Sequence, residues 1–189
     1  TEKLFGKEGV FAADLTARTE LQGSKEAWVA RGGTLPRPWP SPSVTEIEPG
    51  FAFSGGGWRV CSCSVPHVQP YLTSLAFRIE AGKAAFVYAG DAGLCPELED
   101  LAAGADLLLH WCFRLSSETN NPFLTQLSPS PVELAAMAKR IGVKRLVLTH
   151  LRPAMDQAEH RAGIEDELRR HSGKGAVIGD DLMTFTLDV

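Results

Sequence analysis

Between residues 44 and 90 the apolar residues of this chain mostly alternate with polar ones, which is the pattern of β-strands. "TSLAFRIE" alternates, and a turn at "EAGK" leads into "AAFVYAG", a nearly continuous apolar run. A short run of that kind predicts a strand buried on both faces. Before it, "VTEIEPGFAFSGGGWRVCSCSVPH" predicts a hairpin that turns at "SGGG".

Helical patterns alternate with strands in the rest of the chain. "CPELEDLAAGA" predicts a helix with Pro96 in its first turn, and "SPSPVELAAMAKRIG" one that is capped by Ser130, with Glu133 three residues later and Gly142 at its end. "DLLLHW" and "VKRLVLTH" predict buried strands, "DQAEHRAGIEDELRRHSG" a charged helix, and "GAVIGDDLMTFTLDV" a terminal pair of short strands. We therefore expect an α/β protein, with residues 1–189 in a single layered domain.

The N-terminal segment has a weaker pattern. "TARTELQGSKEAWVA" predicts a helix, and "RGGTLPRPWPSPS" is rich in proline and glycine, which indicates an irregular surface connection. The pattern leaves open whether this segment lines a pocket or packs elsewhere.

Composition narrows the class of protein. An apolar share of 44% with 22% charged residues is typical of a soluble globular protein. The net charge of −4 and the absence of a Lys/Arg run argue against a broad surface for nucleic acid, but they leave room for a small anionic substrate. No stretch approaches the ~20 apolar residues of a membrane span. The four cysteines form no C-x-x-C pair and are read as small hydrophobes in a reducing compartment, which favours the cytoplasm.

Three polar residues share one position in the predicted pattern. His67, Asp91 and His150 each follow an apolar strand directly, and His67 and Asp91 end what we expect to be neighbouring strands. The carboxyl ends of strands in layered α/β proteins are where ligands bind, because loops there open onto a rigid base. Two imidazoles and a carboxylate are ligands that zinc accepts, with iron and manganese as competitors. The pattern therefore predicts a metal site.

Simpler interpretations stand beside this one. A histidine at a strand end often bonds only a loop carbonyl, and Asp91 in "GDAG" could cap the following helix or form a turn. His110 also ends a strand, and we interpret it as a hydrogen-bonded structural histidine. His160 and His171 lie in the charged helix and are read as solvated surface residues.

In order and spacing, "SLAFRI", "YAGD", "ADLLLH" and "GVKRLVLTHLRP" resemble the C-terminal half of metallo-β-lactamase-fold hydrolases, in the ribonuclease Z and arylsulfatase-like branch. The resemblance covers residues 54–189. It implies that His67 is the family's single metal-binding histidine, Asp91 the carboxylate that bridges two metals, and His150 a ligand of the second metal. The implied fold is a four-layer αββα sandwich with the metals at one edge.

The chain departs from that family at several places. The signature H-x-H-x-D-H is absent, so the resemblance implies a domain without its N-terminal part. Trp111 stands where the ribonuclease branch has a glutamate, and "LSPSP" has no counterpart of the histidine in that branch's Gly-His-Ser. Only residues 68–90 separate His67 from Asp91, which leaves room for a hairpin and not for a long tRNA-binding arm. We therefore expect tRNA not to be a substrate.

The resemblance implies a hydrolase in which two zinc ions, or manganese or iron, activate a water for attack on a small ester-type substrate. Arg152 could contact an anionic substrate, or it could be an ordinary surface arginine. The alternative function is that of a non-catalytic or incomplete homologue that acts as a scaffold. A half-sandwich would expose an apolar sheet, which we expect a further N-terminal segment or a second copy, as in a dimer or other homo-oligomer, to cover.

Overall fold

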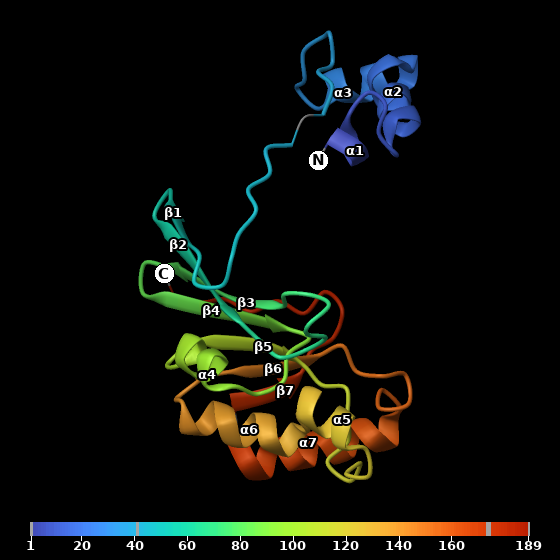
Figure 1. The fold of residues 1–189 in the computed structure, drawn as a ribbon. Coiled ribbons are helices and arrows are strands. Elements are labelled where there is room, and N and C mark those ends of the chain that lie inside the picture. Colours follow the sequence, from blue (N-terminus) through green and yellow to red (C-terminus); the bar gives the residue numbers. More distant parts are fainter. Residues whose placement is uncertain (1, 41, 173–174, 189) are drawn as a thin grey trace. The chain divides into compact units, whose positions relative to one another are not determined.

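The computed structural model describes residues 2–40, 42–172 and 175–188 (Figure 1). They form two compact units, one that ends at Ile47 and one that begins at Glu48. The single domain expected from the sequence stays a prediction. No helix in the described ranges is long and apolar enough to cross a membrane.

The N-terminal unit is helical and contains α1 (Glu2–Phe5), α2 (Ala12–Glu20) and α3 (Gln22–Ala30). The one helix expected over "TARTELQGSKEAWVA" is therefore two, because Leu21 is extended, with φ −64° and ψ 130°. Phe5 stacks on Phe11 with ring centroids 5.8 Å apart, and the Trp39 indole donates a hydrogen bond to the Phe5 carbonyl. Aromatic side chains thus connect α1 to the segment before α2 and to the segment that follows α3.

The second unit is built on one seven-stranded sheet whose strands lie in chain order. The first three pairings are antiparallel and the last three are parallel, so β2, β4, β5, β6 and β7 all run in the same direction. Their carboxyl ends meet at one edge of the sheet. The strands are β1 (Ala52–Gly55), β2 (Trp58–Ser64), β3 (Leu75–Ala81), β4 (Ala84–Gly90), β5 (Leu107–Trp111), β6 (Leu146–Thr149) and β7 (Ala176–Ile178).

The predicted hairpin turns at Gly56 and Gly57, which have φ values of 59° and 88°. Gly55 pairs with Trp58, so these two glycines form the whole loop. A two-residue loop with positive φ at both positions follows the right-handed twist of the strands, and glycine adopts that backbone without steric cost. The local sequence is therefore sufficient to set this register.

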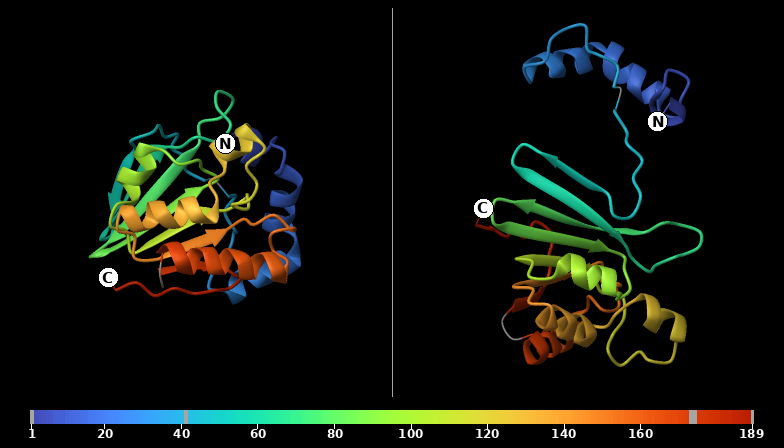
Figure 2. Two further views of the ribbon diagram at one scale, coloured as in Figure 1. Left: turned by 90° about the horizontal axis from the view of Figure 1, so that it is seen from below. Right: turned by 60° about the vertical axis from the view of Figure 1, so that its left-hand side comes forward.

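Helices cover one face of the sheet (Figure 2). Because consecutive parallel strands lie side by side in one order and crossovers are right-handed, their helices fall on the same face. Leu98, Leu134 and Ile164, one from each of three helices, pack against the sheet residues Val87 and Leu108 in a single buried cluster. The helices of this unit are α4 (Pro96–Ala102), α5 (Pro122–Leu127), α6 (Pro131–Arg140) and α7 (Ala158–Ser172).

The other face of the sheet is less covered. Ala85, Val87 and Ala89 of β4 are buried beneath the helices, but Tyr88 points the other way and is 44% exposed. The expectation that β4 is buried on both faces is therefore wrong for the described part of the chain. Within residues 175–188, β7 is the one strand found of the expected terminal pair. The segment that follows it lines a cavity of about 490 Å³ against β4, β5 and β6.

The α/β fold class is confirmed. The described residues supply one sheet with its layer of helices, which are two adjoining layers of the expected four-layer sandwich.

Candidate metal centre

The three predicted metal ligands lie at the carboxyl edge of the sheet. Asp91 follows β4 directly, His150 follows β6 directly, and His67 comes three residues after the end of β2. β3 lies between β2 and β4, so His67 and Asp91 do not end neighbouring strands as expected. They share the edge nevertheless, because β2 and β4 run in the same direction.

Asp91 and His150 approach each other across the end of β5. The Asp91 Oδ2 and His150 Nε2 atoms are 3.8 Å apart, and the two side chains are 37% and 53% exposed. The backbone is unusual beside both: the β4–β5 register shifts between Tyr88 and Gly90, and His150 has a φ of 54°. A register shift re-aims the chain, and a non-glycine residue rarely adopts positive φ. Both deviations occur where these side chains turn toward the edge.

His67 lies in a loop that is fixed by its own hydrogen bonds. The His67 amide donates to Gln69 Oε1 over 2.7 Å, and Gln69 Nε2 donates to the Val65 carbonyl over 2.7 Å. The Gly93 amide, two residues beyond Asp91, donates to the Pro66 carbonyl over 2.8 Å and so ties the two loops together. The His67 Nδ1 atom is buried and has no hydrogen-bond partner.

Aromatic rings fill the space between the two histidines. The Trp111 ring meets the His67 ring edge to face, with centroids 5.3 Å apart and planes at 87°. It meets the His150 ring at 5.9 Å and 72°. Phe113 stacks on Trp111 with centroids 5.4 Å apart, and its ring is 5.5 Å from that of His150. The sequence pattern gave Trp111 no role beyond a departure from the family.

His110 is fully buried beneath the helices, and burial lowers its pKa to about 4. Its Nδ1 atom lies 2.7 Å from the Trp111 carbonyl oxygen, and its Nε2 atom has no partner. The hydrogen bond expected of His110 is therefore present, and its structural role stays a prediction. His160 and His171 are exposed, as expected.

Arg152 is engaged with the protein rather than free at the surface. Its guanidinium pairs with the Glu118 carboxylate and lies 5.6 Å from the centre of the Phe113 ring. The hydrogen bond from Arg152 lowers the pKa of Glu118. The Arg152 Nε atom is buried and has no partner. The charge of Arg152 is therefore held near His150, but it is already paired with a carboxylate.

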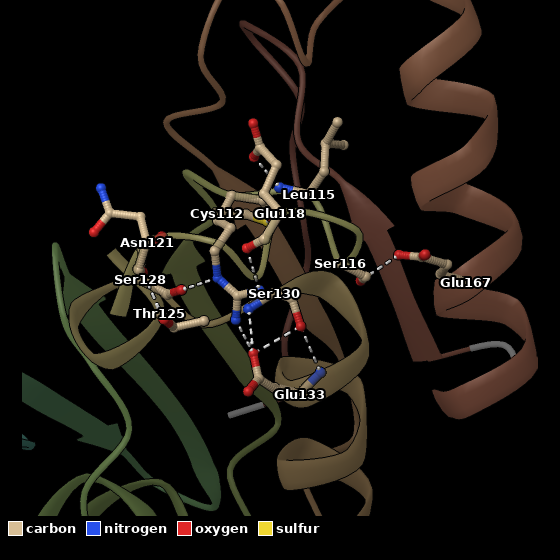
Figure 3. A network of polar contacts seen from close by, with 11 residues as sticks. Cys112, Leu115, Ser116, Glu118, Asn121, Thr125, Ser128, Ser130, Glu133 and Glu167 are labelled. Carbon is tan, nitrogen blue, oxygen red and sulfur yellow. Dashed lines mark hydrogen bonds and ion pairs between the residues drawn. The ribbon is translucent and has the colours of Figure 1, made fainter. Parts of the chain in front are cut away.

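A polar network supports the loop that carries Glu118 (Figure 3). Arg114 is only 2% exposed; its guanidinium donates to the carbonyls of Ser128 and Glu118 and to the Glu133 carboxylate. Glu133 also accepts hydrogen bonds from the Ser130 amide and hydroxyl, over 2.8 and 2.7 Å. Sequence reasoning missed Arg114, although a charged residue in "HWCFR", just past a buried strand, was a signal that it needed partners.

The residues present fit part of a metal site. Within residues 2–40, 42–172 and 175–188, no three His, Cys, Asp or Glu side chains gather closely enough to hold a metal ion. Asp91 and His150 nevertheless meet, and the buried Nδ1 atom of His67 is a nitrogen donor without a partner. Two imidazole nitrogens and one carboxylate oxygen form a donor set that suits zinc.

The family of the chain follows from sequence comparison. A family model described as "Beta-lactamase superfamily domain" matches residues 10–151. The chain therefore belongs to the β-lactamase superfamily, a family of hydrolases. The match begins well before residue 54, so it also includes most of the helical N-terminal unit, which the resemblance drawn from motifs did not reach.

Curated relatives of the chain include ribonuclease Z proteins. Ribonuclease Z of Mycobacterium marinum is 36% identical over 135 residues, which cover 69% of this chain and 46% of that relative. A putative ribonuclease Z of Mycobacterium tuberculosis is 33% identical over 148 residues, which cover 76% of this chain and 65% of the relative. The chain spans about half the length of the curated relatives that it matches.

Solved structures agree on the fold. The metallo-β-lactamase fold protein YhfI of Bacillus subtilis aligns with a TM-score of 0.57 at 22% identity, over 70% of this chain and 51% of that one. The short form of human tRNase Z gives 0.54 at 18%, over 72% and 46%. Zn²⁺-bound PqqB of Methylobacterium extorquens gives 0.57 at 21%, over 75% and 55%. At these identities the likeness establishes the fold alone.

The expectation that tRNA is not a substrate is contradicted by the relatives, whereas the small ester-type substrate stays a prediction. The finding that overturns the expectation about tRNA is that ribonuclease Z proteins are among the curated relatives. The short separation of His67 and Asp91 reflects only the β3–β4 hairpin that lies between them. The spacing of two strand ends does not identify the molecule that binds above them.

Proposed function

We propose that this chain forms the metal-binding half of a hydrolase that cleaves phosphodiester bonds in RNA, with His67, Asp91 and His150 as metal ligands. The observation that carries the proposal is the 3.8 Å approach of Asp91 Oδ2 and His150 Nε2 at the edge where the parallel strands end. Ribonuclease Z relatives and a zinc-bound structural neighbour support it.

Each of the three predicted ligands offers the metal a particular donor atom or group. His150 would bind through Nε2 and Asp91 through its carboxylate, while His67 has an unpartnered Nδ1 atom. Zinc, or manganese or iron in its place, would lower the pKa of a bound water and so supply a nucleophile near neutral pH. Among the chain's other residues, Arg152 would balance phosphate charge from the His150 loop, held there by Glu118.

No proton donor for the leaving group is available at position 111. The Trp111 indole is the only polar group of that side chain, and its N–H is already donated to the Ala92 carbonyl over 2.7 Å. An indole N–H does not ionise at physiological pH, unlike the glutamate that the ribonuclease branch has there. The proposed hydrolase therefore takes this proton from another source than residue 111.

One observation favours a second candidate, a non-catalytic homologue that serves as a scaffold. In the part of the chain that the structure describes, no three candidate ligands come together as a metal-ready group. A scaffold would keep the sheet and lose metal binding, and this difference separates the two candidates.

The test is elemental analysis of protein purified without chelator, for the unaltered chain, Asp91→Ala, His150→Ala and His171→Ala. His171 is an exposed histidine on α7 and provides a matched control. Zinc, manganese or iron lost in the first two variants and retained in the control supports the proposal. Metal content that no substitution changes supports the scaffold. Hydrolysis of bis(p-nitrophenyl) phosphate by the same proteins then tests the reaction itself.

A further inference from the structure

We propose that Trp111 is a positioning residue that holds all three predicted metal ligands in place through one buried indole. This inference rests on the proposed function for its metal, but the arrangement of the side chains is independent of it. Trp111 is 6% exposed and ends β5, the strand between the two that lead into Asp91 and His150.

The indole contacts the two histidines with the same geometry. The planes of the His67 and His150 rings stand at 87° and 72° to the Trp111 plane, with centroids 5.3 and 5.9 Å away. Edge-to-face contacts are directional, because the positive edge of one ring meets the negative face of another. A rotation of either imidazole about χ2 would break its contact. Trp111 therefore restricts the direction in which each ring nitrogen points.

The N–H group of the same indole positions Asp91, the third predicted ligand. Trp111 Nε1 donates to the carbonyl of Ala92, which is fully buried and follows Asp91 directly. A buried N–H that lost this acceptor would be left unsatisfied at a cost in free energy. The hydrogen bond therefore holds the backbone from which the Asp91 carboxylate extends.

Phe113 extends this support to the far side of the site. It stacks on Trp111, contacts the His150 ring and lies under the Arg152 guanidinium. The stacked rings of Trp111 and Phe113 thus both pack against the His150 ring. Metal ligands need to be held within about 0.5 Å of a productive geometry, which rotamers locked by packing achieve.

The positioning role is tested first without metal, by NMR relaxation of the imidazole carbons in ¹³C-histidine-labelled protein. In Trp111→Leu the order parameters of the His67 and His150 rings are expected to fall from rigid to mobile values, while those of His160 and His171 stay unchanged. Trp58→Leu is the matched control, because Trp58 lies at the opposite end of β2, beside Phe53. Unchanged order at His67 and His150 in Trp111→Leu would overturn the proposal.

A second variant guards against misfolding. Trp111→Phe keeps a buried ring and removes only the donor to Ala92, so it is expected to retain order at both histidines and to loosen the Asp91 loop. Amide hydrogen exchange at Ala92 and Gly93 measures that loosening. Exchange equal to that of the unaltered chain, in a folded Trp111→Phe protein, would contradict the role of the hydrogen bond.

Metal affinity completes the test, with Zn²⁺ itself as the probe in equilibrium dialysis. Loss of a group that orients metal ligands weakens binding by about 10- to 100-fold, and Trp111→Leu is expected to fall in that range while Trp58→Leu does not. Equal affinity in Trp111→Leu overturns the positioning role and leaves the proposed function standing. If the unaltered chain binds no Zn²⁺ but the imidazole rings lose order in Trp111→Leu, the proposed function fails and the positioning stands.

Discussion

The Asp91 carboxylate and the His150 imidazole lie 3.8 Å apart although they follow two strands that do not touch, β4 and β6. β5 lies between those strands and ends at Trp111, against whose ring His150 packs. Two residues far apart in the sequence are thus brought to one edge by the order of the strands, and the local backbone at Asp91 and His150 completes their approach.

Zn²⁺ is expected to stabilise the unaltered chain and not Asp91→Asn, which removes the carboxylate charge at nearly constant size. At a Zn²⁺ concentration 100 times the Kd, binding adds about 2.7 kcal/mol, which raises Tm by about 5–10 °C for a chain of this length. Differential scanning fluorimetry with and without Zn²⁺ measures the shift. Asp181→Asn, at an exposed aspartate, is expected to keep it; an equal shift in both variants would exclude Asp91 as a ligand.

Arg114→Lys is expected to destabilise the protein by about 3 kcal/mol although it keeps the positive charge. Lysine cannot reach the Ser128 and Glu118 carbonyls and the Glu133 carboxylate together, because it lacks the planar fork of guanidinium donors. Urea unfolding measures the loss. The same change at the exposed Arg169 is expected to alter the free energy of unfolding by less than about 0.5 kcal/mol.

Ser130→Ala is expected to cost about 1 kcal/mol in the free energy of unfolding. The Ser130 hydroxyl accepts from the Glu133 amide, and the Glu133 side chain accepts from the Ser130 amide, a reciprocal pair at the start of α6. Ser130→Gly is expected to cost only a few tenths of a kcal/mol, since glycine is itself a favoured N-cap residue. Equal losses for alanine and glycine, measured by urea unfolding, would show that the cap is not the source.

Stability is expected to fall by about 3 kcal/mol as the pH is lowered from 6.5 to 4, because burial lowers the pKa of His110 to about 4. The unfolded chain binds a proton at about pH 6.5, whereas the folded chain resists it until about pH 4. The stabilisation is therefore complete above pH 6.5 and is lost as the pH falls through this window. The lowered pKa values of Glu118 and Glu133 place their own contributions at more acidic pH.

Urea unfolding at several pH values tests this dependence. His110→Gln removes the titrating ring and is expected to flatten the curve between pH 6.5 and 4, while His171→Gln, at an exposed position, leaves the slope as it is. A slope that persists in His110→Gln would assign the effect to another group.

Features that a few neighbouring residues encode could be predicted from the amino-acid pattern. The two-glycine hairpin loop, the capping box that begins α6 and the strands that lead to Asp91 and His150 all lie where the pattern predicts them. Periodicity and caps act over one or two turns of chain, so they can be read locally. The family was also recognisable from motifs at strand ends, since those motifs keep their order along the chain.

Which distant residues come into contact could be learned only from the fold. Arg114 and Arg152 both come shortly after buried strands, but the sequence did not identify their partners: one is buried among carbonyls and the other is paired with Glu118. The same holds for Trp111, whose ring meets two histidines from other strands. Such contacts depend on strand order and on the side of the sheet to which each chain segment returns. No local pattern specifies these, because the free energy that selects them comes from burial over the whole unit.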